Sequence, residues 1–347
     1  MSLIACRKSA AGGFLALVAV LIVATTASGG RPARATGSEA KLQRALDRIV
    51  TAGAPGVLAL VRDGGRTLRL ASGYADLRSK RKMRADDRFR VGSVTKTFVA
   101  TVVLQLAGEG TLTLEDTVDH WLPGLVPNGE NITLRQLLTM RSGLFDYLND
   151  GDTTVLEPYL KGDVTRRWTP TQLIEIATTH DPNFPPGTSY RYCNTCYILL
   201  GMIVEAATGN SVGAELKRRI FEPLHLRQTS FDAKPRIAGR HVHGYIIINK
   251  PALHDTTVLS PSWAWSAGAI VSTADDVARF YRALLRGASS RPSSWRRWRQ
   301  PSRPRSGTAT GWVSSRCNCR AAPSGAMTAA SPATRRSPSR ARMASDR

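Results

Sequence analysis

The chain has 347 residues, of which 42% are hydrophobic and 21% are charged, and its formal net charge is +22. Much of this charge lies in residues 288–347, which contain thirteen arginines and one acidic residue. The rest of the chain is only mildly basic, so the charge does not indicate a nucleic-acid partner.

The N-terminal residues 1–27 have the pattern of a secretory signal peptide. Arg7 and Lys8 precede an apolar run over residues 14–24, and small residues follow. The run is short for a transmembrane helix, although a signal that is never cleaved and serves as an anchor is an open alternative. We therefore expect a secreted or cell-envelope protein, with a linker over residues 28–39.

Residues 40–287 are predicted to form one folded domain. Residues 56–74 indicate two strands around the turn at Asp63-Gly64-Gly65. Helical apolar patterns follow over residues 95–106 and 197–207. These runs predict the α/β (α+β) class, with an antiparallel sheet flanked by helices and an all-helical subdomain.

Ser93 and Lys96 form an S-x-x-K pair at the start of the first helical pattern. Residues three apart on a helix share a face, so the lysine amine can reach the serine hydroxyl. A serine is a poor nucleophile until a neighbouring base takes its proton, and burial lowers a lysine pKa toward that role. The alternative is a serine N-cap with a solvated lysine in the first helical turn.

Tyr192 and Asn194 follow a Pro-Pro-Gly turn and stand just before the second helical pattern. A phenol can relay a proton, and an amide can orient a substrate carbonyl. The alternative is that Asn194 is the helix N-cap and Tyr192 a packing residue. The S-x-x-K pair upstream makes the catalytic interpretation more specific.

Together these residues resemble the serine β-lactamase and D-alanyl-D-alanine carboxypeptidase superfamily, with its penicillin-binding-protein fold, in the class C-like branch. The resemblance runs from Ala40 to Gly287. Three stretches without a proposed catalytic group match the family by their order and spacing: residues 108–116, 132–144 and 265–277. In the last stretch, Thr273 is predicted to cap a helix.

The resemblance implies a role for each of the four residues. Ser93 would be the acylated nucleophile, Lys96 would accept its proton, and Tyr192 would shuttle the proton to the leaving group and from the deacylating water. Asn194 would bind the substrate amide, and the backbone N–H of Ser93 would form half of an oxyanion hole. No cofactor or metal is implied. Cys193 departs from the serine or alanine usual at its position.

The family's third motif, a Lys- or His-x-Gly on a strand lining the site, does not occur in the sequence after Val277. His241 and His243 lie too early and are predicted to be ordinary loop or strand histidines. The C-terminal strands of the fold are therefore expected to be missing.

Residues 288–347 are predicted to be a disordered tail rich in Arg, Ser, Pro and Ala. They contain no Leu, Ile, Phe, Tyr, Lys, Glu or His, so they lack the side chains that core strands need. A functional basic tail for nucleic acid or anionic lipid is the alternative. The segment lacks the regular pattern of a basic amphipathic helix, which counts against that alternative.

We interpret the tail as a frameshift product that begins near Gly287. Trp and Met each have a single codon, which fixes some bases of the gene. With each codon read one base earlier, Trp312-Val313 must yield Gly, and Met327-Thr328 must yield Asp. With suitable third bases, the shifted frame also reads Trp-Gly-His-Asp-Gly-Gly, which contains a His-x-Gly. The chain as written is therefore expected to fold poorly and to have severely reduced activity.

Cys193 and Cys196 form a C-x-x-C pair, but the chain has no second pair for zinc and no thioredoxin-like context. In the shifted frame, the codons of residues 320–321 can encode a cysteine. A disulfide from Cys193 or Cys196 to that cysteine is a hypothesis suited to an exported protein.

The sequence thus predicts a serine hydrolase that works through an acyl-enzyme. The resemblance implies a D-alanyl-D-alanine carboxypeptidase-like activity on peptidoglycan peptides or other small amides and esters, with β-lactams as acylating ligands. An esterase or β-lactamase of the same fold, and a non-catalytic penicillin-binding relic, are alternatives that stay open. No oligomeric state follows from the sequence.

Overall fold

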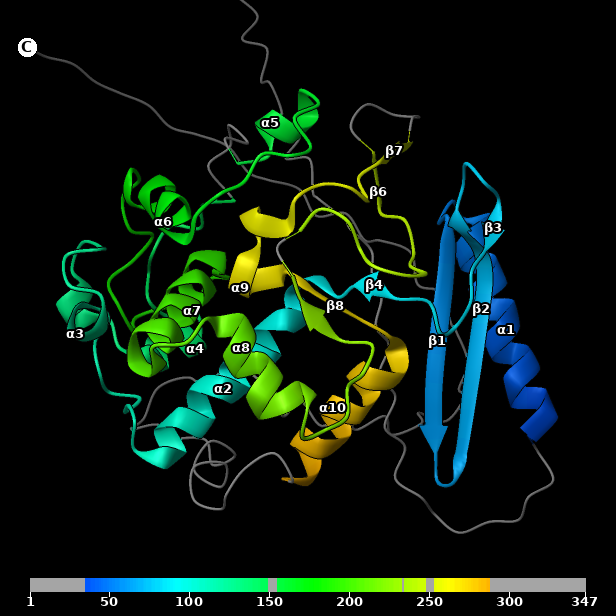
Figure 1. Cartoon of the computed structure of the whole chain (residues 1–347), viewed down its shortest axis with the longest axis horizontal. Helices are drawn as coiled ribbons and strands as arrows, with labels where there is room; N and C mark the ends of the chain where they lie inside the picture. Colours follow the sequence, from blue (N-terminus) through cyan, green and yellow to red (C-terminus); the bar gives the residue numbers. More distant parts are fainter. Residues whose placement is uncertain (1–34, 149–154, 233, 248–252, 288–347) are drawn as a thin grey trace, which may run out of the picture. The chain divides into compact units, whose positions relative to one another are not determined.

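The computed structural model describes residues 35–148, 155–232, 234–247 and 253–287. The predicted signal peptide and the predicted tail lie outside these residues. The helices labelled in Figure 1 are α1 (Ala35–Thr51), α2 (Thr95–Glu109), α3 (Val118–Trp121), α4 (Leu134–Leu138), α5 (Glu157–Leu160), α6 (Pro170–Thr178), α7 (Asn194–Thr208), α8 (Val212–Leu216), α9 (Trp265–Gly268) and α10 (Ala274–Arg286). The strands are β1 (Gly56–Asp63), β2 (Arg66–Asp76), β3 (Arg81–Lys82), β4 (Phe89–Arg90), β5 (Ser230–Phe231), β6 (Tyr245–Ile247), β7 (Leu253–Asp255) and β8 (Ile270–Ser272).

The predicted hairpin is present as strands β1 and β2, which pair antiparallel (Figure 1). Asp63 pairs with Arg66, so Gly64 and Gly65 form a two-residue turn between the strands. Gly64 has a φ of 56°, a left-handed conformation that glycine adopts at no steric cost. The turn prediction is confirmed at these residues.

Helix α1 packs beside the hairpin through buried Leu46. The carboxylate of Asp47 also accepts a hydrogen bond from the Ser72 hydroxyl on β2, at 2.7 Å. Because α1 begins at Ala35, residues 35–39 are helical and do not belong to the predicted linker.

The mixed α/β class with antiparallel strands is confirmed. The strands of the described residues fall into three small sheets, with orders β1-β2-β3, β4-β8-β5 and β6-β7, where a single sheet was expected. Strands β4, β5 and β8 are two or three residues long, and Val271 of β8 pairs with both Arg90 and Ser230. This short central strand therefore joins segments far apart in the chain.

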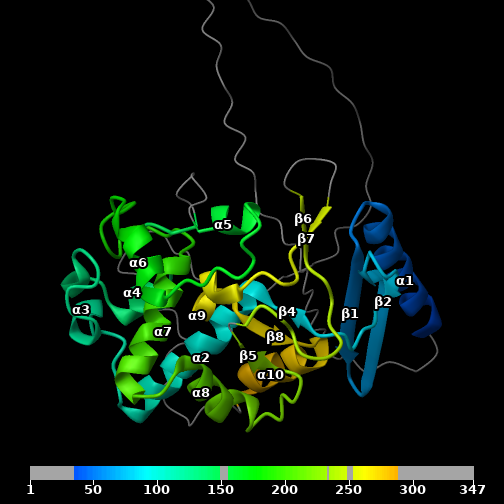
Figure 2. The ribbon, with the colours of Figure 1, turned by 45° about the horizontal axis from the view of Figure 1, so that its top comes forward.

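The helical core is built around α2, α7 and α10 (Figure 2). Phe98 of α2 is fully buried, stacks on Phe280 of α10 at 3.7 Å between ring centroids, and meets the edge of Phe221 at 6.0 Å. Both predicted helices exist: α2 starts at the predicted residue and extends beyond its predicted end, and α7 begins before its predicted start. Thr273 caps α10 by accepting a hydrogen bond from the N–H of Asp276, as predicted.

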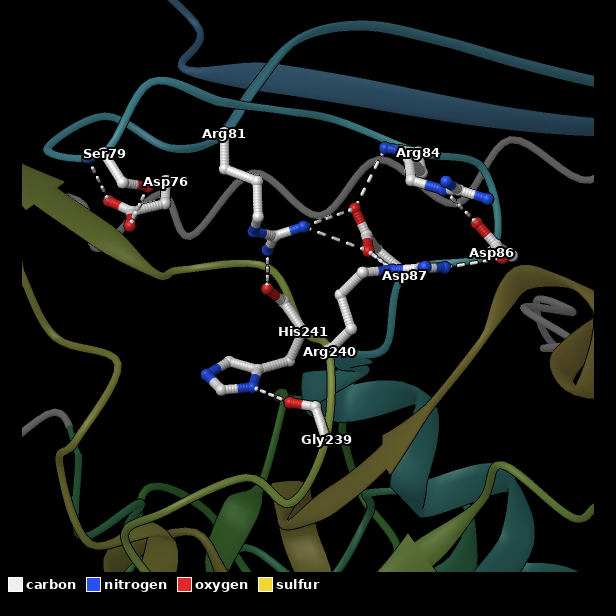
Figure 3. Close-up of polar contacts among 9 residues, drawn as sticks. All are labelled: Asp76, Ser79, Arg81, Arg84, Asp86, Asp87, Gly239, Arg240 and His241. Atoms are coloured by element: carbon white, nitrogen blue, oxygen red, sulfur yellow. Dashed lines mark hydrogen bonds and ion pairs between the residues drawn. The ribbon is translucent and has the colours of Figure 1, made fainter.

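A charged cluster connects the segment after β3 to the loop before β6 (Figure 3). The buried carboxylate of Asp87 accepts hydrogen bonds from Arg81 at 3.2 Å and from Arg240 at 2.6 Å. Arg81 also donates to the backbone carbonyl of His241, whose ring contacts the carbonyl of Gly239. A buried carboxylate is tolerated when such donors surround it. His241 also forms an isolated parallel bridge with Arg88, which agrees with its predicted loop or strand position.

In the described part of the chain, no single helix is long and apolar enough to cross a membrane. Helix α7 passes that test only in combination with residues 212–221, and the two segments meet at an angle of 84°. Most of α7 is buried against other helices of the core.

Candidate active site

Ser93 lies on a short 3₁₀ turn, Gly92–Val94, which directly precedes α2. Its side chain makes no capping hydrogen bond to α2, so the N-cap interpretation is wrong. A 3₁₀ turn has three residues per turn, which places residues i and i+3 almost in line. The Oγ of Ser93 accordingly lies 3.0 Å from the Nζ of Lys96. Ser93 is exposed, so a substrate can reach it.

Lys96 is the second residue of α2, and only 5% of its surface is exposed. The alternative of a solvated lysine is therefore wrong. Burial lowers the pKa of Lys96 from its ordinary value to about 7, while the negative charge of Asp146 acts in the opposite direction. Near neutral pH a substantial fraction of this amine is uncharged and able to accept a proton.

The contacts of Lys96 suit an uncharged amine that faces the serine. Its Nζ lies 2.8 Å from the Oδ1 of Asn194 and 2.9 Å from the carbonyl oxygen of Ala267. Both atoms can only accept, so they take the two N–H groups of a neutral amine. In the protonated amine the third N–H donates to the Ser93 Oγ, and in the uncharged amine a lone pair takes the place of that N–H and can accept from the Ser93 hydroxyl.

Tyr192 lies just before α7, and its hydroxyl donates to the Oγ of Ser93 at 2.7 Å. Burial raises the pKa of Tyr192, which keeps the phenol protonated at neutral pH, while the hydrogen bond with Ser93 acts in the opposite direction. The Tyr192 ring also lies 4.9 Å from the Nζ of Lys96. Its hydroxyl is thus in hydrogen-bonding reach of the serine, which pure packing would not require.

Cys193, and not Asn194, caps helix α7, because its Sγ accepts the N–H of Cys196 at 2.9 Å. The N-cap alternative for Asn194 is therefore wrong. The two cysteines are bonded to each other, with their Cα atoms 5.3 Å apart, which is within the usual range for a disulfide. In the structure, Cys193 and Cys196 are therefore each other's disulfide partners, and neither is left to pair with the hypothetical cysteine at 320–321.

The structure brings all four predicted residues, Ser93, Lys96, Tyr192 and Asn194, into one hydrogen-bonded group. Two members of this group were missed. One is the carbonyl of Ala267, which lies in a stretch matched to the family only by its order and spacing. The other is Asp146, a buried acid that accepts hydrogen bonds from Asn194 and follows the Ser-Gly-Leu turn at 142–144. The position of an aspartate directly after that turn was the sequence feature that could have identified Asp146 as part of the site.

An exposed serine that contacts a buried, low-pKa lysine and a protonated tyrosine is the arrangement expected of a serine acyl-transfer site. The chain also matches the model of the Beta-lactamase family over residues 42–327, of which 149–154, 233, 248–252 and 288–327 lie outside the described residues. Because this match covers most of the sequence, the chain belongs to the Beta-lactamase family.

Similar proteins include several hydrolases. A D-aminopeptidase of Cereibacter sphaeroides is 34% identical over 206 residues, which are 59% of this chain and 38% of the relative. Esterase EstB of Burkholderia gladioli is 32% identical over 256 residues, 66% of this chain and 65% of the esterase. The crystal structure of a D-stereospecific amidohydrolase from a Streptomyces species is 38% identical, with a TM-score of 0.69, and the match covers 74% of this chain and 76% of that one. The chain spans well under half the length of the D-aminopeptidase it matches.

Proposed function

We propose that this domain is a serine hydrolase that cleaves small amides through an acyl-enzyme, with a D-configured residue on the acyl side of the bond. The observation that carries the proposal is the position of the exposed Ser93 Oγ, at 3.0 Å from the Nζ of Lys96 and 2.7 Å from the hydroxyl of Tyr192. The preference for a D-residue is supported by similarity to the D-stereospecific amidohydrolase and the D-aminopeptidase.

In the acylation step, uncharged Lys96 takes the proton of Ser93 while the Oγ bonds to the substrate carbonyl carbon. The backbone N–H of Ser93 donates to the oxyanion that develops. The C–N bond then breaks as Tyr192 gives its proton to the leaving nitrogen, and the proton held on Lys96 restores the phenol. The amine product leaves, and the acyl group stays on Ser93.

In the deacylation step, water attacks the acyl carbon and its proton passes to the same pair of groups, Lys96 and Tyr192. The bond between the acyl carbon and the Ser93 oxygen breaks, and the serine regains a proton from Lys96. The acid product leaves with the free enzyme restored. Asn194, beside Lys96, is proposed to orient the substrate amide.

A D-alanyl-D-alanine carboxypeptidase acting on peptidoglycan peptides is the specific version of this proposal, because such a peptide also places a D-residue on the acyl side. β-Lactams are proposed as acylating ligands on the basis of family membership. An esterase is the second candidate, supported by the similarity to EstB, which extends over two thirds of this chain.

A substrate panel separates these activities. Purified protein is assayed with a D-amino-acid amide and its L-enantiomer, a peptide ending in D-Ala-D-Ala, a short p-nitrophenyl ester and a labelled β-lactam. Release of D-amino acids, with the β-lactam label attached to Ser93, supports the proposal. Hydrolysis of the ester, with no release of D-amino acids and no β-lactam label on Ser93, supports the esterase. Binding of β-lactam with neither acylation nor turnover indicates a relic. Ser93→Ala should abolish each reaction, and Ser79→Ala, which changes an exposed serine of the turn after β2, should not.

Export through the signal at residues 1–27 and the frameshift near Gly287 are proposed from the sequence. Resequencing the gene across codons 280–300 tests the frameshift. The panel is then run on the chain as written and, if a base is gained or lost, on the restored frame. We expect severely reduced turnover from the chain as written, because its third motif is absent from the sequence. Full turnover by that chain would refute this expectation.

A further inference from the structure

Asp146 is a carboxylate that is almost fully buried, with 2% of its surface exposed, in the loop between α4 and α5. Its Oδ2 accepts the backbone N–H of Asn194 at 3.0 Å and the side-chain Nδ2 at 2.9 Å. Its Oδ1 accepts the N–H of Leu148 at 3.0 Å. A buried carboxylate is costly unless it is well hydrogen-bonded, so this acid depends on its donors, and Asn194 supplies two of the three groups named here.

These contacts decide which way the amide of Asn194 faces. The oxygen and nitrogen of an asparagine amide have nearly the same shape, so packing alone does not distinguish the two orientations. A carboxylate only accepts, and it therefore selects the orientation with Nδ2 toward Asp146. The Oδ1 then faces the Nζ of Lys96, at 2.8 Å. In the reverse orientation, the NH₂ group would face the amine N–H groups, and the oxygen would face the carboxylate.

We propose that Asp146 is a positioning residue of the site, which acts through Asn194 to aim the amine of Lys96 at Ser93. The inference rests on the proposed function, since it assigns a role within that reaction. With Oδ1 of Asn194 and the carbonyl of Ala267 both fixed as acceptors, the amine has one free direction left, toward the serine. Without Asp146 the amide can turn, and Lys96 loses one of the two contacts that direct its lone pair.

The charge of Asp146 gives the proposal a signature that packing does not share. The titratable groups that face Lys96 are Asp146 from the loop after α4, Tyr192 ahead of α7, and Tyr197 on α7, whose ring centroid is 5.7 Å from the Nζ. The phenols are neutral near pH 7, whereas the carboxylate favours the protonated amine. Removing this charge should lower the pKa of Lys96 and shift the acid limb of serine reactivity to lower pH.

Two variants of the full chain separate orientation from charge. Asp146→Asn keeps an acceptor oxygen for Asn194 and removes the charge, while Asp146→Leu removes both. The matched control is Asp276→Asn, because Asp276 is similarly buried and accepts from the N–H of Gln228 and the hydroxyl of Thr229 instead. The readout is the rate at which a fluorophosphonate probe labels Ser93 between pH 5 and 9, measured by intact mass and corrected for the folded fraction.

We expect Asp146→Leu to label about 10- to 100-fold more slowly above the acid limb, as small misplacements of catalytic groups do. Asp146→Asn should retain most of the rate with its acid limb at lower pH, and Asp276→Asn should follow the wild type. The proposal is overturned if Asp146→Asn has the wild-type acid limb. If Asp146→Leu does not fold, the limb of Asp146→Asn decides alone.

A second measurement protects this test from failure of the proposed function. If the wild type takes no label at any pH, the proposed hydrolase activity loses support, but the Asp146 inference is still testable. The Lys96 side chain is then titrated by NMR with ¹³C-lysine, with Lys96→Met for assignment. A lower midpoint in Asp146→Asn than in the wild type supports the role of Asp146, and an unchanged midpoint rejects it.

Discussion

The β1–β2 hairpin and the helical core are both apolar in sequence, but they are buried to different extents. In β1, the residues from Gly56 to Arg62 are only partly buried, although five of them are Val, Leu or Ala. In α2, by contrast, Phe98, Val99, Val102 and Val103 are fully buried. A continuous apolar run such as that of β1 is typical of a strand inside a sheet whose two faces are both covered. Within the described residues, however, β1 pairs with β2 alone.

This difference shows where the candidate site obtains its support. Ser93 and Lys96 stand at the start of α2, and Tyr192 and Asn194 at the start of α7, so all four are held by the well-buried part. The hairpin contributes none of them. Strand β1 is half-buried, while the geometry around Ser93 depends on helices α2 and α7, most of whose residues are buried.

The largest expected effect is on the chemistry carried by the helical core. Ser93→Ala removes the oxygen that would form the acyl-enzyme, so covalent labelling by fluorophosphonate should be lost completely, with hydrolysis reduced by about 1,000-fold or more. Thermal stability should stay near that of the wild type, because Ser93 is exposed. Labelling of the alanine variant at another residue would assign the nucleophile elsewhere.

The next largest effect compares packing in the two regions directly. Phe98→Ala deletes a buried ring stacked on Phe280 and should cost about 3–5 kcal/mol of unfolding free energy. Leu60→Ala, at a half-buried position of β1, should cost about 1–2 kcal/mol, since less of its surface leaves water on folding. Urea unfolding measures both. Equal costs would mean that β1 is as well covered as α2.

The features that could be predicted from sequence are the locally coded ones. The turn at Gly64-Gly65, the start of α2 at Thr95 and the cap at Thr273 each depend on neighbouring residues. The contact of Asp146 with Asn194 spans 48 positions, and that of Lys96 with the carbonyl of Ala267 spans 171. No local pattern encodes such pairs, and a backbone carbonyl has no residue-type signal at all. The family resemblance located the stretches, but it assigned them no role.

Burial of Lys96 also makes stability depend on pH. Its pKa is about 7 in the folded chain and near 10.4 when unfolded, so between these values the unfolded chain binds more protons and stability rises with pH. Below pH 7 the cost of burying the charge is fully present. From pH 7 to 9, the wild type should gain up to about 1.4 kcal/mol per pH unit relative to Lys96→Met. Urea midpoints of both proteins at three pH values measure this gain, and parallel pH curves would contradict the low pKa.

The smallest effect tests how the hairpin is attached to the core. Arg62 and Arg69 of the hairpin both contact the carboxylate of Asp275 on α10, at 3.0 and 2.8 Å, and these side chains are partly exposed. Solvent screens such pairs, so Asp275→Asn should cost about 1 kcal/mol at low salt and less at high salt. The control is Glu115→Gln, which breaks an exposed pair with Arg135 away from the hairpin and should cost less.

Loss of the Asp275 pairs and loss of the Glu115–Arg135 pair should differ most in which backbone amides exchange faster. If Asp275 holds a half-covered hairpin, Asp275→Asn should speed hydrogen exchange at the amides of β1 and β2 while α2 and α7 keep their protection. In the wild type, the hydrogen bond from Arg69 is the main cause that holds the pKa of Asp275 below its ordinary range. The ion pairs that attach the hairpin to α10 should therefore persist at neutral pH and weaken only as pH falls through that lowered pKa. Faster exchange spread evenly over both regions would show that the hairpin and the helical core unfold as one unit, which would remove the distinction between them.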